Sequence, residues 1–124
     1  MDAQELKDSL GTFYGTENYY MFLPGLLMTD GVKYLADNAK AYWLMDMIWS
    51  YLPTLKRKRE TFALVRYAGQ PGGSGLFSIT DDDPAHITYA TQAVEYSDFP
   101  LDEIRLYLSL ADEGRFVVML TSEY

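Results

Sequence analysis

Residues 29–52 read TDGVKYLADNAKAYWLMDMIWSYL and form the longest segment of this 124-residue chain with one clear period. The apolar side chains recur every three or four residues, which is the spacing of a helix face that packs on a core. Thr29 and Asp30 are suited to cap the start, and Pro53 predicts an end near residue 52. Asn38 tolerates the left-handed conformation that ends helices, so the helix either continues or breaks near residues 38–40. The apolar stripe comprises Val32, Leu35, Ala36, Ala39, Trp43, Leu44, Met47, Ile48 and Tyr51.

Two other patterns surround this segment. Before it, Asp2 and Glu5 predict a short helix that ends near Gly11. Thr16 then predicts a helical turn over residues 16–23, and Pro24-Gly25 predicts a tight turn after it. After Pro53 the period changes to two, which predicts strands near residues 61–68, 76–80, 85–95, 104–110 and 115–120. We therefore expect one α+β domain over residues 1–124, with N-terminal helices packed on a C-terminal antiparallel meander of about five strands.

Composition narrows the class of protein. A hydrophobic fraction of 48% with 15% aromatic residues is typical of a chain with a packed core. The absence of cysteine excludes disulfides, thiolate catalysis and cysteine-ligated zinc. The N-terminus MDAQELKDSL does not have the apolar centre of a signal peptide, and no run reaches the roughly 18 apolar residues of a membrane span. These features predict a soluble cytoplasmic protein that does not bind membranes.

The net charge of −8 is unevenly distributed. Residues 1–60 contain eight acidic and seven basic residues, whereas residues 61–124 contain ten acidic and three basic residues. An acidic half repels nucleic acid and attracts a protein partner with a basic surface, so direct nucleic-acid binding is not expected. The predicted protein-binding residues are Asp81, Asp82, Asp83, Asp98, Asp102 and Glu103. A predicted basic contact patch comprises Lys56, Arg57, Lys58 and Arg59.

Candidate catalytic and metal-binding residues are few. His86 is the only histidine, so it predicts either strand-edge packing or a single general base. The glycine-rich segment 69–75 lacks the lysine of a phosphate-binding loop and predicts a hairpin connection. Asp81 to Asp83 are consecutive rather than alternating, which favours a solvated turn over a metal site. Asp46 lies among apolar residues and requires a polar partner if it is buried. We predict no cofactor and no metal.

Three stretches together resemble a family of small bacterial proteins of unknown function found on plasmids and in phages. They are FYGTENYY (13–20), TDGVKYLADNAKAYWLMDMI (29–48) and YSDFPLDEIRLYL (96–108), followed by the closing TSEY. The resemblance covers most of the chain and is weakest at residues 53–60 and 69–75. No established activity accompanies the family. What the resemblance implies is a mobile-element context, in which small acidic proteins, such as those resembling anti-CRISPR inhibitors, act by binding.

These observations lead to three hypotheses. The first is a non-enzymatic acidic protein of a mobile genetic element that binds and inhibits a host or defence protein, presenting a surface that mimics nucleic acid. The second is a homo-oligomeric structural or adaptor module, such as a homodimer, in which the basic contact patch docks on the acidic face of another copy. The third is a small enzyme that uses His86 or a buried carboxylate.

Overall fold

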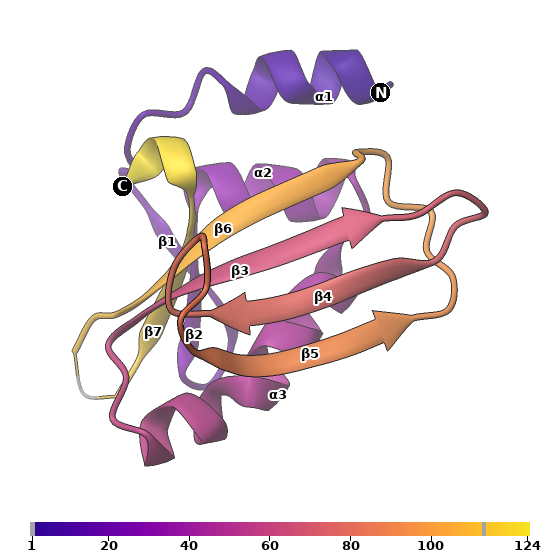
Figure 1. The fold of residues 1–124 in the computed structure, drawn as a ribbon. Coiled ribbons are helices and arrows are strands. Elements are labelled where there is room, and N and C mark those ends of the chain that lie inside the picture. Colours follow the sequence, from indigo (N-terminus) through magenta and orange to yellow (C-terminus); the bar gives the residue numbers. More distant parts are fainter. Residues whose placement is uncertain (1, 113) are drawn as a thin grey trace.

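The computed structural model describes residues 2–112 and 114–124. Within these residues the chain forms three α-helices, seven strands and a closing 3₁₀ turn (Figure 1). The helices are α1 (Ala3–Leu10), α2 (Asp30–Asn38) and α3 (Tyr42–Arg57), and the 3₁₀ turn η1 spans Thr121–Glu123. The strands are β1 (Tyr19–Leu23), β2 (Leu26–Thr29), β3 (Phe62–Gly69), β4 (Gly75–Thr80), β5 (Thr88–Val94), β6 (Glu103–Leu110) and β7 (Phe116–Leu120).

The strands form one mixed sheet in the order β1-β2-β7-β6-β3-β4-β5. Strands β3 to β7 pair antiparallel with one another. Strand β2 runs parallel to β7 and attaches the N-terminal hairpin to the sheet. The α+β class is therefore confirmed. The order of the C-terminal strands differs from a simple meander at one point, because β6 pairs with β3 rather than with β5. The connection at residues 95–102 carries the chain past the start of β4 and the end of β3 (Figure 1).

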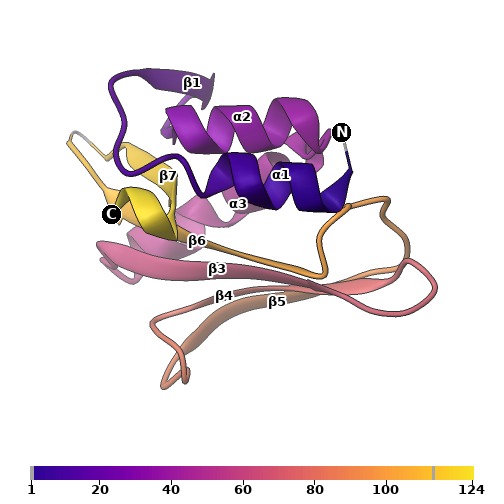
Figure 2. The same ribbon diagram turned by 90° about the horizontal axis from the view of Figure 1, so that it is seen from above.

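All three helices lie on one face of the sheet (Figure 2). The apolar stripe of α2 and α3 packs against the helix-facing residues of the strands, including Val65, Phe77 and Leu106, with Trp43, Met47 and Tyr51 only partly buried. Burying a large apolar side chain contributes roughly 1.5–3 kcal/mol of stability, and this burial holds the two layers together. None of the helices in the described part of the chain is long and apolar enough to cross a membrane.

The break near residues 38–40 is confirmed, and the left-handed residue is Lys40, with a φ of 52°. The prediction that the helix ends at Pro53 is wrong, because α3 continues to Arg57. Proline removes the hydrogen bond to the carbonyl of Trp49, but continuation buries Leu55 completely in the core. Asp46 lies exposed on α3, so it needs no buried partner.

The predicted helical turn over residues 16–23 is also wrong. Residues 19–23 form β1, which pairs with β2 through the turn at Pro24-Gly25. Tyr20 and Phe22 pack toward the core, whereas Tyr19 and Met21 are exposed, so the segment has a period of two that the dense tyrosines obscured. Glycine at position 25 has a φ of 95°, which confirms the predicted turn.

Candidate functional site

The six predicted protein-binding acids separate into two groups in the structure. Asp81, Asp82 and Asp83 lie in the β4–β5 connection, which folds over the sheet face opposite the helices (Figures 1 and 2). Asp81 accepts hydrogen bonds from the backbone N–H groups of His86 and Ile87, both at 2.9 Å. The hydrogen bond from Ile87 is the main cause that lowers the pKa of Asp81, and the bond from His86 lowers it further. Asp81 therefore shapes the connection rather than serving as a free charge, and Asp82 is exposed on it.

Asp83 and Glu103 are neutralised on that same face by two arginines. Arg105 lies 2.7 Å from the carboxylate of Asp83 and 2.6 Å from that of Glu103. Arg66 donates to the second oxygen of Glu103 at 2.8 Å. The hydrogen bond from Arg66 and then that from Arg105 lower the pKa of Glu103 to about 2. This ion-pair network attaches the connection to the sheet, so neither acid is available to attract a partner.

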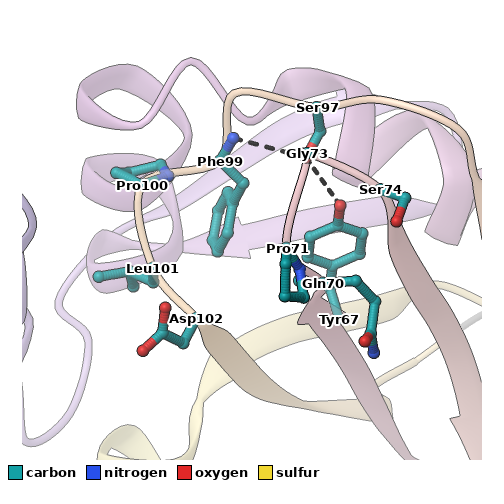
Figure 3. A pocket seen from close by; sticks show the side chains of 11 residues that line it. Tyr67, Gln70, Pro71, Gly73, Ser74, Ser97, Phe99, Pro100, Leu101 and Asp102 are labelled. Atoms are coloured by element: carbon teal, nitrogen blue, oxygen red, sulfur yellow. Dashed lines mark hydrogen bonds between the residues drawn. The ribbon is translucent and has the colours of Figure 1, made fainter.

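Asp102 lines a recess of about 300 Å³ at the other end of β3, and Asp98 lies between two of its lining residues, Ser97 and Phe99. Both acids are exposed, and neither forms an ion pair within residues 2–112 and 114–124. The recess opens between the β3–β4 hairpin loop and the connection leading to β6 (Figure 3). Its lining residues are Tyr67, Gly69, Gln70, Pro71, Gly73, Ser74, Ser97, Phe99, Pro100, Leu101 and Asp102. We call this recess with Asp98 and Asp102 the acidic loop end.

Backbone hydrogen bonds hold the two loops of the recess together. Gly69 donates to the carbonyl of Asp102 at 2.8 Å, and Ser97 donates to the carbonyl of Gly73 at 2.7 Å. Gly73 has a φ of 94°, and a Cβ there would lie 2.7 Å from the ring of Tyr96. Only glycine allows this close approach, so the glycine-rich segment is an ordered wall rather than a free loop.

Aromatic rings form the base of the recess. Tyr67 is only 1% exposed, and its hydroxyl shares a hydrogen bond of 2.7 Å with Ser97 Oγ. Phe99 lies 5.6 Å from Tyr67 between ring centroids, and both contact Trp43 of α3 edge-on. In Figure 3, Leu101 and Asp102 lie on the Phe99 side of the recess, whereas Pro71 and Gln70 lie beside Tyr67. The site is thus apolar at its base and acidic at its rim.

The basic contact patch, Lys56 to Arg59, is exposed where α3 ends and the chain turns into β3. No ion pair to these four residues occurs in the described part of the chain. Eight residues of β3 separate the patch from the acidic loop end, a distance of about 23 Å at the usual rise of a strand. The two charged surfaces therefore lie at opposite ends of the sheet.

His86 lies on the exposed β4–β5 connection, before β5 begins at Thr88, so the prediction of strand-edge packing is wrong. Its side chain is 79% exposed, and Nδ1 lies 3.6 Å from the Asp81 carboxylate. Because the imidazole is open to solvent, the pair lacks the enclosed setting in which general acid–base groups usually work. No group of three or more histidine, aspartate or glutamate residues suited to holding a metal occurs among the described residues.

Comparison with known proteins assigns the chain to a family. A family model matches residues 4–124. The chain belongs to DUF6876, a family of unknown function. Searches among curated proteins and among solved structures find no match. Membership over nearly the whole chain confirms the resemblance to a family of unknown function, while an origin in plasmids or phages stays a prediction.

Two of the stretches that carried this resemblance, residues 13–20 and 29–48, meet the closing TSEY at the N-terminus of α2 in this DUF6876 chain. The Asp30 carboxylate accepts hydrogen bonds from the N–H groups of Glu17 and Asn18 at 2.9 and 3.3 Å and from the Tyr20 hydroxyl at 3.1 Å. The bond from Glu17 is the main cause that lowers the pKa of Asp30. Glu123 of the closing TSEY accepts from the same helix end. These residues hold together segments that are distant in sequence, so their role in the fold explains why they are part of the motif.

Sequence reasoning missed the recess of this DUF6876 member, although both of its walls were predicted as loops. The segments at residues 69–75 and 97–102 lie far apart in sequence and come together only because β6 pairs with β3. A partial signal was present in the Ser97–Pro100 turn, where an aromatic residue lies between an acid and a proline. That pattern alone does not show which loop it faces.

Proposed function

We propose that this member of DUF6876 acts by binding a protein with a basic surface, and that the acidic loop end is its contact site. Asp98 and Asp102 support the proposal, because they are exposed acids without a counter-cation in the described chain and border a recess. Asp81, Asp83 and Glu103 have internal partners and contribute less. Asp82 is exposed but does not line the recess, so the proposed contact site comprises Asp98 and Asp102.

In the specific form of the proposal, the partner is a host or defence protein whose basic surface otherwise binds nucleic acid. The protein would then be an inhibitor encoded by a plasmid or phage, acting in the manner of an anti-CRISPR protein. Exposed carboxylates around a concave surface suit this role, since they attract the same positive charges that attract phosphates. The attraction is strongest at low ionic strength, because the Debye length falls to about 8 Å at physiological salt.

The experiment is affinity capture from host cells with a charge-reversal variant. The double variant Asp98→Lys with Asp102→Lys changes the net charge by four units at the acidic loop end. A matched control, Asp8→Lys with Glu17→Lys, makes the same change on exposed residues of the N-terminal segment. The wild type and the control should capture the same partner, identified by mass spectrometry, and release it as salt rises. Equal capture by the Asp98/Asp102 variant would refute the proposal.

A second candidate function, homo-oligomerisation, is favoured by the opposite charge of the two ends. The basic contact patch of one copy would dock on the acidic loop end of another, which gives a head-to-tail contact. Light scattering across a salt series tests it. Assemblies that dissociate as salt rises, and that Lys56→Glu with Arg59→Glu abolishes, would support this function. A monomer at all salt concentrations would refute it.

A further inference from the structure

We infer that the recess of the acidic loop end receives a single arginine side chain of the partner. The inference rests on the proposed function and specifies the chemistry of the contact. A volume of about 300 Å³ lies at the lower limit of small-molecule sites, which usually span roughly 300–1,000 Å³. A recess of this size suits one long side chain better than a cofactor or a folded segment.

The lining combines two features that an arginine requires. Phe99 provides the aromatic surface of the base, and the buried Tyr67 ring supports it edge-on. Pro71 and Pro100 lie in the walls. A guanidinium is planar and weakly hydrated, so it packs on aromatic rings at a smaller desolvation cost than an ammonium. The aliphatic stem of the arginine would lie along the prolines, and its charged group would remain near the rim.

Hydrogen-bond acceptors stand at the rim of the same recess. Asp102 contributes a carboxylate, which can accept two parallel N–H donors from one guanidinium. Gln70 and Ser74 contribute an amide oxygen and a hydroxyl. None of the described residues that line the recess is basic, so an anionic ligand would meet only repulsion there. Two of the five donors of a guanidinium match the Asp102 carboxylate, and Gln70 and Ser74 stand on the opposite side of the recess.

The recess is held in shape before a ligand enters. The backbone bonds between the two loops and the Tyr67–Ser97 hydrogen bond fix both walls. A preformed site avoids the ordering cost that weakens binding to mobile loops. Trp43 contacts Tyr67 and Phe99 directly, with centroid distances of 5.2 and 6.2 Å. Its fluorescence should therefore change when the recess fills.

The test uses the full chain with Trp49→Phe, so that Trp43 is the single tryptophan. N-acetyl-arginine-methylamide is titrated against this protein at constant ionic strength, with N-acetyl-lysine-methylamide in parallel. Saturable quenching or enhancement with a dissociation constant on the order of 1 mM is expected for the arginine derivative. The lysine derivative should bind several-fold more weakly, because its ammonium neither stacks nor forms a paired contact with a carboxylate.

Two variants localise the ligand. Asp102→Asn should weaken binding of the arginine derivative about tenfold, and Gln70→Ala should weaken it two- to threefold, while the control Glu17→Gln should leave it unchanged. Circular dichroism verifies that each variant is folded, and Gln70→Ala carries the test if Asp102→Asn does not fold. Equal binding of the two derivatives, or of wild type and Asp102→Asn, would overturn the inference. No fluorescence change, with capture still lost in the Asp98/Asp102 charge-reversal variant, would overturn the inference alone and leave the proposed function standing.

Discussion

Truncation of Glu123 should destabilise the protein far more than its place near the C-terminus suggests. Its carboxylate accepts hydrogen bonds from Thr29 Oγ1 at 2.6 Å, from Gly31 N at 3.0 Å and from Leu120 N at 3.0 Å. Bonds to a charged group contribute about 1.5–3 kcal/mol each, and an anion at a helix N-terminus adds about 0.3–1 kcal/mol. Because water can reach part of the site, we expect a loss of about 3 kcal/mol for Glu123→Ala.

Urea denaturation followed by tryptophan fluorescence measures this loss. For a chain of this size, about 3 kcal/mol corresponds to a fall in melting temperature of about 12 °C. Glu123→Gln keeps an acceptor oxygen but loses the charge, so it should cost about half as much. Glu17→Gln is the control, since its side chain is exposed. A Glu123→Ala protein within about 0.5 kcal/mol of the wild type would show that the closing turn does not anchor α2.

Three further substitutions test other contacts by the same urea measurement. Gly31→Ala should cost about 2 kcal/mol, because a Cβ there would lie 2.6 Å from the Glu123 carboxylate and force it away. Glu103→Gln should cost about 1 kcal/mol at pH 7, a value reduced for its partial exposure. Since the pKa of Glu103 is lowered to about 2 from an ordinary 4.5, this difference should persist above pH 4.5 and vanish as pH falls toward 2. Tyr67→Phe should cost about 1 kcal/mol by removing the hydrogen bond to Ser97 while keeping the ring contacts, and no change would exclude that bond as a support of the recess.

Local patterns predicted most elements because they depend on neighbours in sequence. Thr29 caps α2 as expected, since an N-cap needs only its own helix. The hairpin between β3 and β4 follows from the glycine-rich segment between two alternating runs. Pro53 was misjudged because the rule against interior proline concerns one hydrogen bond, whereas the burial of Leu55 that outweighs it depends on the sheet.

The acidic residues were harder to interpret, because charge in a sequence carries no information about partners. Glu103 and Asp102 are adjacent in the chain, yet one accepts from two arginines and the other has no ion pair in the described residues. Arg66 approaches Glu103 only because β3 pairs with β6. The non-local pairing of strands that created the recess also decided which acids remained exposed at its rim.

Ion pairs within the protein change the electrostatic field that a partner encounters. Asp83 and Glu103 are balanced by Arg66 and Arg105, so Asp81 and Asp82 supply the remaining negative charge of the connection on the sheet face opposite the helices. Asp98 and Asp102 at one end, and Lys56 to Arg59 at the other, form no ion pairs within the described residues. These ends are about 23 Å apart, which exceeds the Debye length of about 8 Å at physiological salt, so a partner at one end is screened from the other. A basic partner would therefore meet Asp98 and Asp102 without repulsion from the basic contact patch, and the recess lies at the end that carries these two acids.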